Sequence, residues 1–148
     1  MIEFKNIKKS FDDKIVLNDV SHVMQTGMCN LIIGTSGSGK TVLQKCLVGL
    51  FEPDEGEIIY DGKSFTEMND EERKELRQQI GMLFQGSALF DSMTVEQNVM
   101  FPLEMFSTMN HSDKLKRVNE VLARVNLQDV NKKFPAELSG GMKKRVGI

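Results

Sequence analysis

The sequence predicts an α/β fold with a β-rich first part, a central strand–loop–helix unit and a helical last part. Three observations support this: short apolar runs with strand spacing before residue 27, a glycine-rich loop at residues 34–41, and helical periodicity beyond residue 94. We expect one domain over residues 1–148. Its parts are a β-rich lobe (1–27 and 57–66), the loop with its strand and helix (28–51), a helix, core strand and loop (67–93), and a helical subdomain (94–148).

The β-rich lobe is predicted from apolar residues that roughly alternate with polar ones over residues 2–7 and continue at short spacing over 17–23. A strand over residues 30–33 leads into the glycine-rich loop, and a helix over 42–48 leads out of it. After the turn cluster at 52–56, residues 57–60 form a predicted strand.

The second half is predicted to be mainly helical. Residues 68–77 indicate a surface helix, with acidic residues first and basic ones later, as the helix dipole favours. Residues 80–84 are an apolar run of strand length. Helices are expected over 94–105 and 112–125, and from about Ser139 onward.

Composition excludes little. At 40% apolar and 27% charged residues the chain is ordinary for a globular domain, and its net charge of −2 gives no electrostatic reason to expect a nucleic-acid partner. No apolar stretch approaches the ~18 residues of a membrane span, and the N-terminus has no signal-peptide pattern, so a cytosolic location is expected.

Cys29 and Cys46 are predicted to be reduced core thiols rather than a disulfide or a metal site.

The glycine-rich loop matches the phosphate-binding pattern G-x-x-x-x-G-K-[ST]. Its members are Gly34, Thr35, Ser36, Gly37, Ser38, Gly39, Lys40 and Thr41. Successive backbone N–H groups of such a loop surround a phosphate, and the following helix directs the positive end of its dipole toward it. Lys40 would reach the β- and γ-phosphates, and the Thr41 hydroxyl would bind Mg²⁺. The sequence therefore predicts a nucleotide-binding protein.

Two further strings accompany the loop. Leu138 is followed by Ser139, Gly140 and Gly141 at the start of a predicted helix, which alone would be only an N-cap and a loose first turn. Gln85 stands alone after the apolar run at 80–84; a neutral amide can orient water beside a triphosphate without adding charge, although a solvent-facing glutamine is the simpler interpretation.

In this order, the loop, the glutamine and the Leu-Ser-Gly-Gly string resemble the ATP-binding subunit of an ABC transporter over the whole chain. The resemblance implies an ABC-type P-loop NTPase fold that uses ATP and Mg²⁺. Gln85 would contact Mg²⁺ and the attacking water. Phe11 would stack on adenine, unless it packs beneath the β-rich lobe. Ser139, Gly140 and Gly141 would contact the ATP held by a partner subunit.

The resemblance also implies a homodimer that binds membrane permease subunits on the cytoplasmic side of the inner membrane, without contact to the cargo. Methionines and phenylalanines in the helical segment either form its core or receive a permease helix. They are Met93, Met100, Phe101, Met105, Phe106 and Met109. Residues 82–95 resemble the Mla-type branch, linked to phospholipid, apart from the order of the pair Gly86-Ser87.

The family's strand ending in Asp-Glu and its later histidine fall beyond Ile148. We therefore expect the chain to be part of a protein of about 250 residues, to lack catalysis alone, and to leave the strands at 28–33 and 80–84 without neighbours.

Several alternatives remain open. They are a lipoprotein-release or small-solute ABC ATPase, a soluble ABC ATPase, a P-loop kinase or GTPase, and a short nucleotide-binding protein without hydrolysis. A kinase or GTPase would leave the string at 138–141 without a role.

Overall fold

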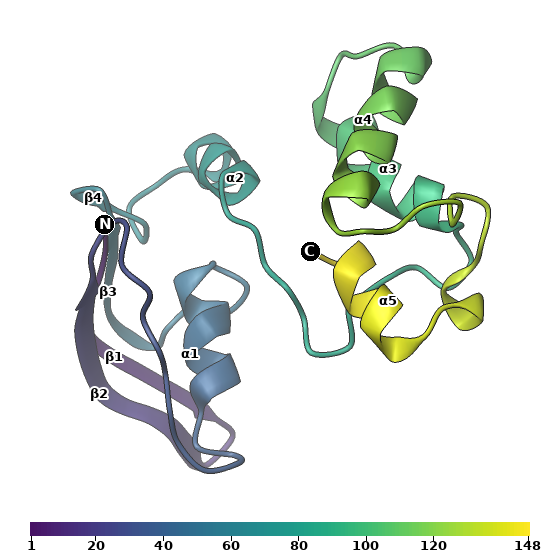
Figure 1. Cartoon of the computed structure of the whole chain (residues 1–148). Coiled ribbons are helices and arrows are strands. Elements are labelled where there is room, and N and C mark those ends of the chain that lie inside the picture. The colour runs from purple at the N-terminus through teal and green to yellow at the C-terminus, as the bar shows by residue number, and fades with distance from the viewer. The chain divides into compact units, whose positions relative to one another are not determined.

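The computed structural model describes all residues from Met1 to Ile148 and divides them into two units, residues 1–80 and 81–148 (Figure 1). Residues 81–93, which were expected to form one part with residues 67–80, fall in the second unit together with the helical segment.

The first unit is built on a four-stranded antiparallel sheet in the order β2-β1-β3-β4. Its strands are β1 (Ile2–Phe11), β2 (Lys14–Met24), β3 (Glu55–Tyr60) and β4 (Lys63–Ser64). In the register, β1 lies between its neighbours with Ile2 opposite both Met24 and Tyr60. The predicted β-rich lobe is therefore present, formed by two segments that are distant in the sequence.

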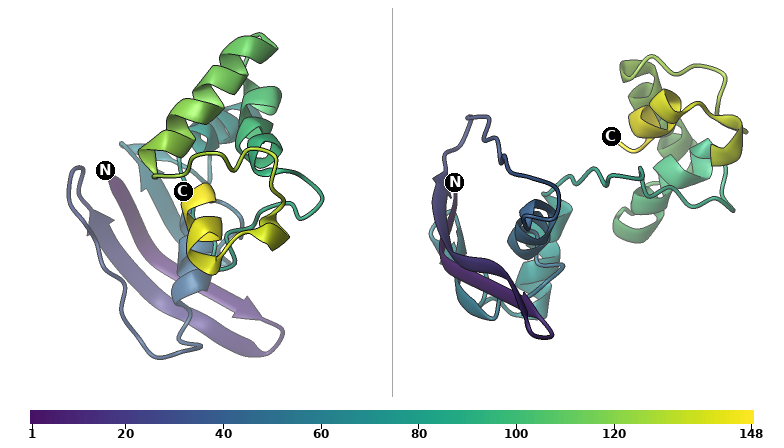
Figure 2. Two further views of the ribbon diagram at one scale, coloured as in Figure 1. Left: turned by 45° about the vertical axis from the view of Figure 1, so that its right-hand side comes forward. Right: turned by 90° about the horizontal axis from the view of Figure 1, so that it is seen from below.

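Two helices lie on one face of this sheet, α1 (Lys40–Leu47) and α2 (Asp70–Gln78), as the views of Figures 1 and 2 show. The buried side chains between sheet and helices are Phe4, Ile7, Leu17, Leu43, Cys46, Leu47, Ile58, Tyr60 and Phe65. The Tyr60 hydroxyl donates a hydrogen bond to the Leu47 carbonyl, and Arg77 donates one to the Gly49 carbonyl at 2.9 Å. These bonds tie the end of α1 to β3 and α2, which holds the helix that follows the glycine-rich loop.

The strands expected over residues 28–33 and 80–84 do not form, and both segments lack regular secondary structure. A strand needs a hydrogen-bonded neighbour, and neither segment finds one within the 148 residues. Several of their side chains remain open to solvent, with Leu31 83% and Ile33 81% exposed, whereas Ile32 and Ile80 are partly buried against the core of the first unit. The prediction that Cys29 is a core thiol is wrong for the same reason, since Cys29 is exposed. Cys46 is buried as expected, and burial raises the pKa of its thiol.

The second unit contains α3 (Val95–Phe106), α4 (His111–Arg124), the 3₁₀ turn η1 (Pro135–Glu137) and α5 (Gly140–Val146). Its core consists of Val95, Met100, Val118, Leu122, Leu127, Val130, Leu138 and Val146. Each α-helix begins at a capping side chain, because Thr94, Asn110 and Ser139 accept hydrogen bonds from backbone N–H groups three residues later. None of the helices combines the length and apolar character that a membrane span requires.

Candidate functional site: a phosphate loop and its accessory segments

Residues 34–41 form a tight turn that ends at the first residues of α1. Gly39 is the N-cap of α1 with φ +89°, and no side chain caps the helix. Gly37 also has a positive φ, +78°, a conformation that glycine adopts without strain. Because no side chain satisfies the first N–H groups of α1, they remain available to an anionic ligand.

The Lys40 side chain turns back into the loop. Its ammonium donates hydrogen bonds to the carbonyls of Gly34 at 2.8 Å and Thr35 at 2.7 Å. The loop is closed further by the Ser38 N–H, which donates to the Thr35 carbonyl at 3.3 Å. No carboxylate pairs with Lys40, so its charge is held only by neutral carbonyl oxygens. An ammonium held in this way can exchange those carbonyls for phosphate oxygens without breaking an ion pair.

Gly39 has a second role, because it lies against the sheet. A Cβ at this position would stand 2.9 Å from the Val16 carbonyl oxygen and 3.0 Å from a Leu17 methyl group. The loop end therefore contacts the backbone of β2, and this contact fixes the start of α1 against the β-rich lobe.

Phe11, the predicted adenine-stacking residue, is the last residue of β1 and is 39% exposed. It is not packed beneath the lobe, which was the alternative. Its ring meets Phe51 edge-on, with the ring centroids 5.4 Å apart. Phe11 and the phosphate loop thus belong to the same unit.

Gln85 and residues 139–141 belong to the second unit. Gln85 is exposed in a turn over residues 85–88, whose last two residues, Ser87 and Ala88, have left-handed φ values of 66° and 50°. This turn packs against the end of α5, since a Cβ on Gly147 would lie 3.0 Å from the Ser87 carbonyl oxygen. The structure therefore brings the glutamine turn and the Ser-Gly-Gly helix together, which the sequence did not predict.

Ser139 is the N-cap of α5, and its Oγ accepts from the Met142 N–H at 3.3 Å. Gly140 and Gly141 are exposed and have no positive φ, and a Cβ added to either would meet no heavy atom within 4 Å. Neither backbone conformation nor packing inside the chain requires glycine here. What these glycines provide is open space directly at a helix N-terminus.

Asn98 is a residue whose role sequence reasoning missed. Its amide oxygen accepts from the Phe90 N–H at 2.7 Å, and its amide nitrogen donates to the carbonyls of Phe90, Met93 and Thr94 at 2.9–3.1 Å. One side chain therefore holds the loop between the glutamine turn and α3. The sequence does contain one indication of this role, because Asn98 lies in the first turn of the helix that Thr94 caps.

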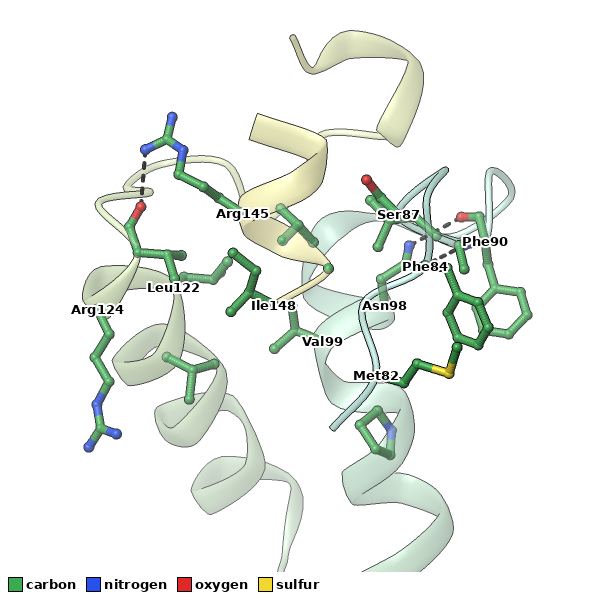
Figure 3. Close-up of a pocket in the computed structure, with 17 residues that line it drawn as sticks. Met82, Phe84, Ser87, Phe90, Asn98, Val99, Leu122, Arg124, Arg145 and Ile148 are labelled. Atoms are coloured by element: carbon green, nitrogen blue, oxygen red, sulfur yellow. Dashed lines mark hydrogen bonds between the residues drawn. The ribbon is translucent and has the colours of Figure 1, made fainter. Parts of the chain in front are cut away.

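A pocket of about 600 Å³ lies within the second unit (Figure 3). Figure 3 shows Met82, Phe84 and Phe90 along one side, with Leu122 and Ile148 opposite. Most of its lining is apolar. Of the methionines and phenylalanines considered above, Met100 is buried in the core, whereas Phe101, Met105, Phe106 and Met109 are exposed on and after α3. The core interpretation is therefore confirmed for Met100, and contact of the exposed residues with a permease helix stays a prediction.

Comparison with known proteins agrees with this arrangement. The family model described as ABC transporter matches residues 17–148. The methionine import ATP-binding protein MetN of Rhizobium johnstonii is 40% identical over 148 residues, which cover 100% of this chain and 41% of that protein. Protein TRIGALACTOSYLDIACYLGLYCEROL 3, chloroplastic, of Arabidopsis thaliana is 42% identical, with 100% of this chain and 43% of that protein covered.

A solved dimeric structure of MJ0796, a bacterial ABC transporter cassette, superimposes with a TM-score of 0.89 at 31% identity, covering 100% of this chain and 67% of that one. The chain spans less than half the length of the curated relatives it matches. Both the ABC-type fold and the family resemblance are confirmed, whereas relatives with different named roles do not single out the Mla-type branch. With its phosphate loop, glutamine turn and Ser-Gly-Gly helix in one order, the chain belongs to the ABC transporter family.

Proposed function

We propose that this chain is part of the ATP-binding subunit of a transporter, in which ATP binding and hydrolysis drive a membrane permease. The observation that carries the proposal is the phosphate loop at the uncapped N-terminus of α1, with Lys40 held only by loop carbonyls. Residues 34–41 would surround the β- and γ-phosphates with backbone N–H groups, and the Lys40 ammonium would move from the carbonyls onto the phosphate oxygens.

The side-chain oxygens available to a metal ion fit Mg²⁺, which prefers hard oxygen ligands. Those that the family resemblance assigns to the metal are the Thr41 hydroxyl in the first unit and the Gln85 amide in the second, and both residues are exposed. When bound, Mg²⁺ neutralises charge that develops on the phosphates during transfer. Gln85 would also orient the attacking water, and Phe11 would stack on adenine with its exposed ring.

Two copies would close on ATP between them, with Ser139, Gly140 and Gly141 of one copy approaching the γ-phosphate held by the other. The open space at the two glycines supports this, because an anion can approach the α5 backbone without meeting a side chain. The dimeric form in which the MJ0796 cassette was solved also supports it. ATP would drive closure only to the extent that it binds the closed dimer more tightly than the open one.

The apolar pocket of the second unit and the exposed side chains of α3 would receive a short helix of the permease. Phe101, Met105 and Phe106 give this surface soft, adaptable groups, which suit an irregular helical partner. This location would place the subunit at the cytoplasmic side of the inner membrane, attached through its permease and away from the cargo.

For the cargo, we propose a lipid of the phospholipid class. The resemblance of residues 82–95 to the Mla-type branch supports the phospholipid class. A relative named after a galactolipid, which carries no phosphate, supports a lipid cargo only in general. A small solute such as an amino acid is the second candidate, because another relative is named a methionine import protein. Purification with the permease followed by mass spectrometry of bound lipid, and a test of whether methionine stimulates ATP turnover, would decide between them.

The experiment on the site uses the whole protein with two test substitutions, Lys40→Ala and Ser139→Arg, and one control, Lys63→Ala. Lys40→Ala should abolish ATP turnover, while Lys63→Ala, which removes an exposed lysine outside the loop, should leave it unchanged. Ser139→Arg should preserve ATP binding to the monomer but block dimer closure and hydrolysis, because the long side chain fills the space before Gly140 and Gly141. Normal hydrolysis by Ser139→Arg would refute the proposed dimer.

A further inference from the structure

The end of β1 extends beyond its partner strand. β1 pairs with β3 from Ile2 opposite Tyr60 to Lys8 opposite Glu55, and no β3 residue lies opposite the last three residues of β1. The backbone on this edge would therefore lack a partner just before Phe11. Unpaired strand ends fray, because each N–H group without a partner exchanges freely with water.

Asp54 takes the place of the missing strand. Its backbone N–H donates to the Lys8 carbonyl at 2.8 Å, and its carboxylate accepts from the Lys9 ammonium and from the Ser10 N–H, both at 2.6 Å. One residue thus contacts three consecutive residues of β1. The hydrogen bond from Lys9, followed by that from Ser10, lowers the pKa of the Asp54 carboxyl, so the carboxylate stays ionised at neutral pH.

Phe51 supports the ring of Phe11 from a different element. The two rings meet at an interplanar angle of 68°, and the Phe51 N–H donates to the Lys45 carbonyl of α1 at 3.1 Å. The Lys45 ammonium also lies 4.9 Å from the Phe51 ring centroid. Phe51 is therefore fixed to the same helix whose N-terminus forms the end of the phosphate loop.

Lys9 contacts both Asp54 and the ring of Phe11. Its ammonium is bound to Asp54 and lies 5.5 Å from the centroid of Phe11, over the ring. Its side chain is only 17% exposed, so this position is defined by packing rather than by solvent. Asp54 thus holds residues 8–10 directly before Phe11, Phe51 contacts the Phe11 ring, and Lys9 lies over that ring, while Phe11 still exposes 39% of its surface.

We propose that Asp54 and Phe51 are positioning residues for nucleotide base recognition: they hold the Phe11 ring in a fixed orientation, relative to the phosphate loop, for stacking on the base of a nucleoside triphosphate. This inference rests on the proposed stacking role of Phe11. A ring fixed before binding loses less conformational freedom when the base arrives, so the supports contribute to affinity without touching the ligand.

The test separates the base from the phosphates. Dissociation constants are measured in the whole protein for Mg–ATP and for Mg–tripolyphosphate, a probe with the phosphates and no base. Phe11→Ala should weaken ATP binding about 10-fold or more and tripolyphosphate binding less than about 2-fold, as expected for loss of a stacked base. Asp54→Ala and Phe51→Leu should each weaken ATP binding about 3- to 10-fold with the same selectivity.

Glu55→Ala is the matched control, because Glu55 forms an ion pair of the same length, 2.6 Å, with Lys8 rather than with residues 9–11. Glu55→Ala should leave the ratio of the ATP affinity to the tripolyphosphate affinity unchanged. In the Phe11→Ala background, Asp54→Ala should cause no further loss of ATP affinity, since its effect passes through the ring. Asp54→Asn, which keeps an oxygen for Ser10 and loses the ion pair, should fall between wild type and Asp54→Ala.

The possible results separate the stacking role of Phe11 from the positioning role of Asp54 and Phe51. If Phe11→Ala leaves the affinity ratio unchanged, the stacking role itself is wrong. If Phe11→Ala lowers the affinity for ATP relative to that for tripolyphosphate but Asp54→Asn and Phe51→Leu do not, the stacking role stands. The positioning inference is then overturned. A further loss from Asp54→Ala in the Phe11→Ala background would also overturn it. Should Asp54→Ala prevent folding, Asp54→Asn and Phe51→Leu decide the matter alone.

Discussion

Replacing Gly39 with alanine tests whether the end of the phosphate loop is held by the β-rich lobe. Gly39 has φ +89°, where an L-residue costs about 1–2 kcal/mol. The new Cβ would also stand 2.9 Å from the Val16 carbonyl oxygen, a backbone atom of β2 that cannot rotate away. Overpacking of this kind costs about 1–3 kcal/mol. We expect Gly39→Ala to lower the free energy of unfolding of the first unit by about 2–5 kcal/mol.

Gly37→Ala is the matched control in the same loop. Gly37 has a similar φ, +78°, but nothing lies within 4 Å of its Cβ position. Only the conformational cost of about 1–2 kcal/mol is expected there. The difference between the two variants, about 1–3 kcal/mol, therefore measures the contact between the loop end and β2.

Tyrosine fluorescence during urea unfolding is a suitable assay, because the chain has one tyrosine and no tryptophan. That tyrosine, Tyr60, lies in the first unit and bonds to the end of α1, so its signal reports this unit. Equal destabilisation by the two alanine variants, within about 0.5 kcal/mol, would refute the reasoning, because the contact with Val16 would then contribute nothing measurable.

Three further predictions concern other parts of the chain. Ser87→Gly should stabilise the second unit by about 1 kcal/mol, because Ser87 has φ 66°, a conformation that glycine adopts without strain. Denaturation followed by far-UV circular dichroism would measure the change, and a decrease in stability would count against strain in the glutamine turn. Asn98→Ala should destabilise the second unit by about 1–3 kcal/mol, because the Phe90 N–H loses its acceptor, and unchanged denaturation would show that the loop does not depend on this side chain. Burial raises the pKa of Tyr60 from 10.0 to about 12, so the unfolded state loses its tyrosine proton first as pH rises. The contribution of Tyr60 to the free energy of unfolding should be fully present below pH 10 and fall by about 2–3 kcal/mol by pH 12. Over this range Tyr60→Phe, followed by circular dichroism, should lose about 2–3 kcal/mol less stability than the wild type.

Local patterns predicted the local structure well. The β-rich lobe, the helix after the phosphate loop and the helices of the second unit were expected within a few residues of where they occur, because caps such as Thr94 and Asn110 and the apolar spacing act over one or two turns. The strands at 28–33 and 80–84 were predicted by the same patterns and do not form. Apolar β-branched runs favour a strand, but the strand exists only when a neighbouring strand satisfies its backbone.

The sequence by itself determined the nucleotide loop, since its chemistry depends on eight consecutive residues and on the helix that follows them. Through resemblance to a family, it also predicted roles for Phe11, Gln85 and residues 139–141. Only the tertiary structure decided what supports these residues. Asp54 reaches Ser10 and Phe51 reaches Phe11 across about forty residues, and Gly147 lies against the glutamine turn across about sixty, through contacts that no local spacing encodes. Such contacts depend on how separate elements pack, and packing is a property of the whole fold.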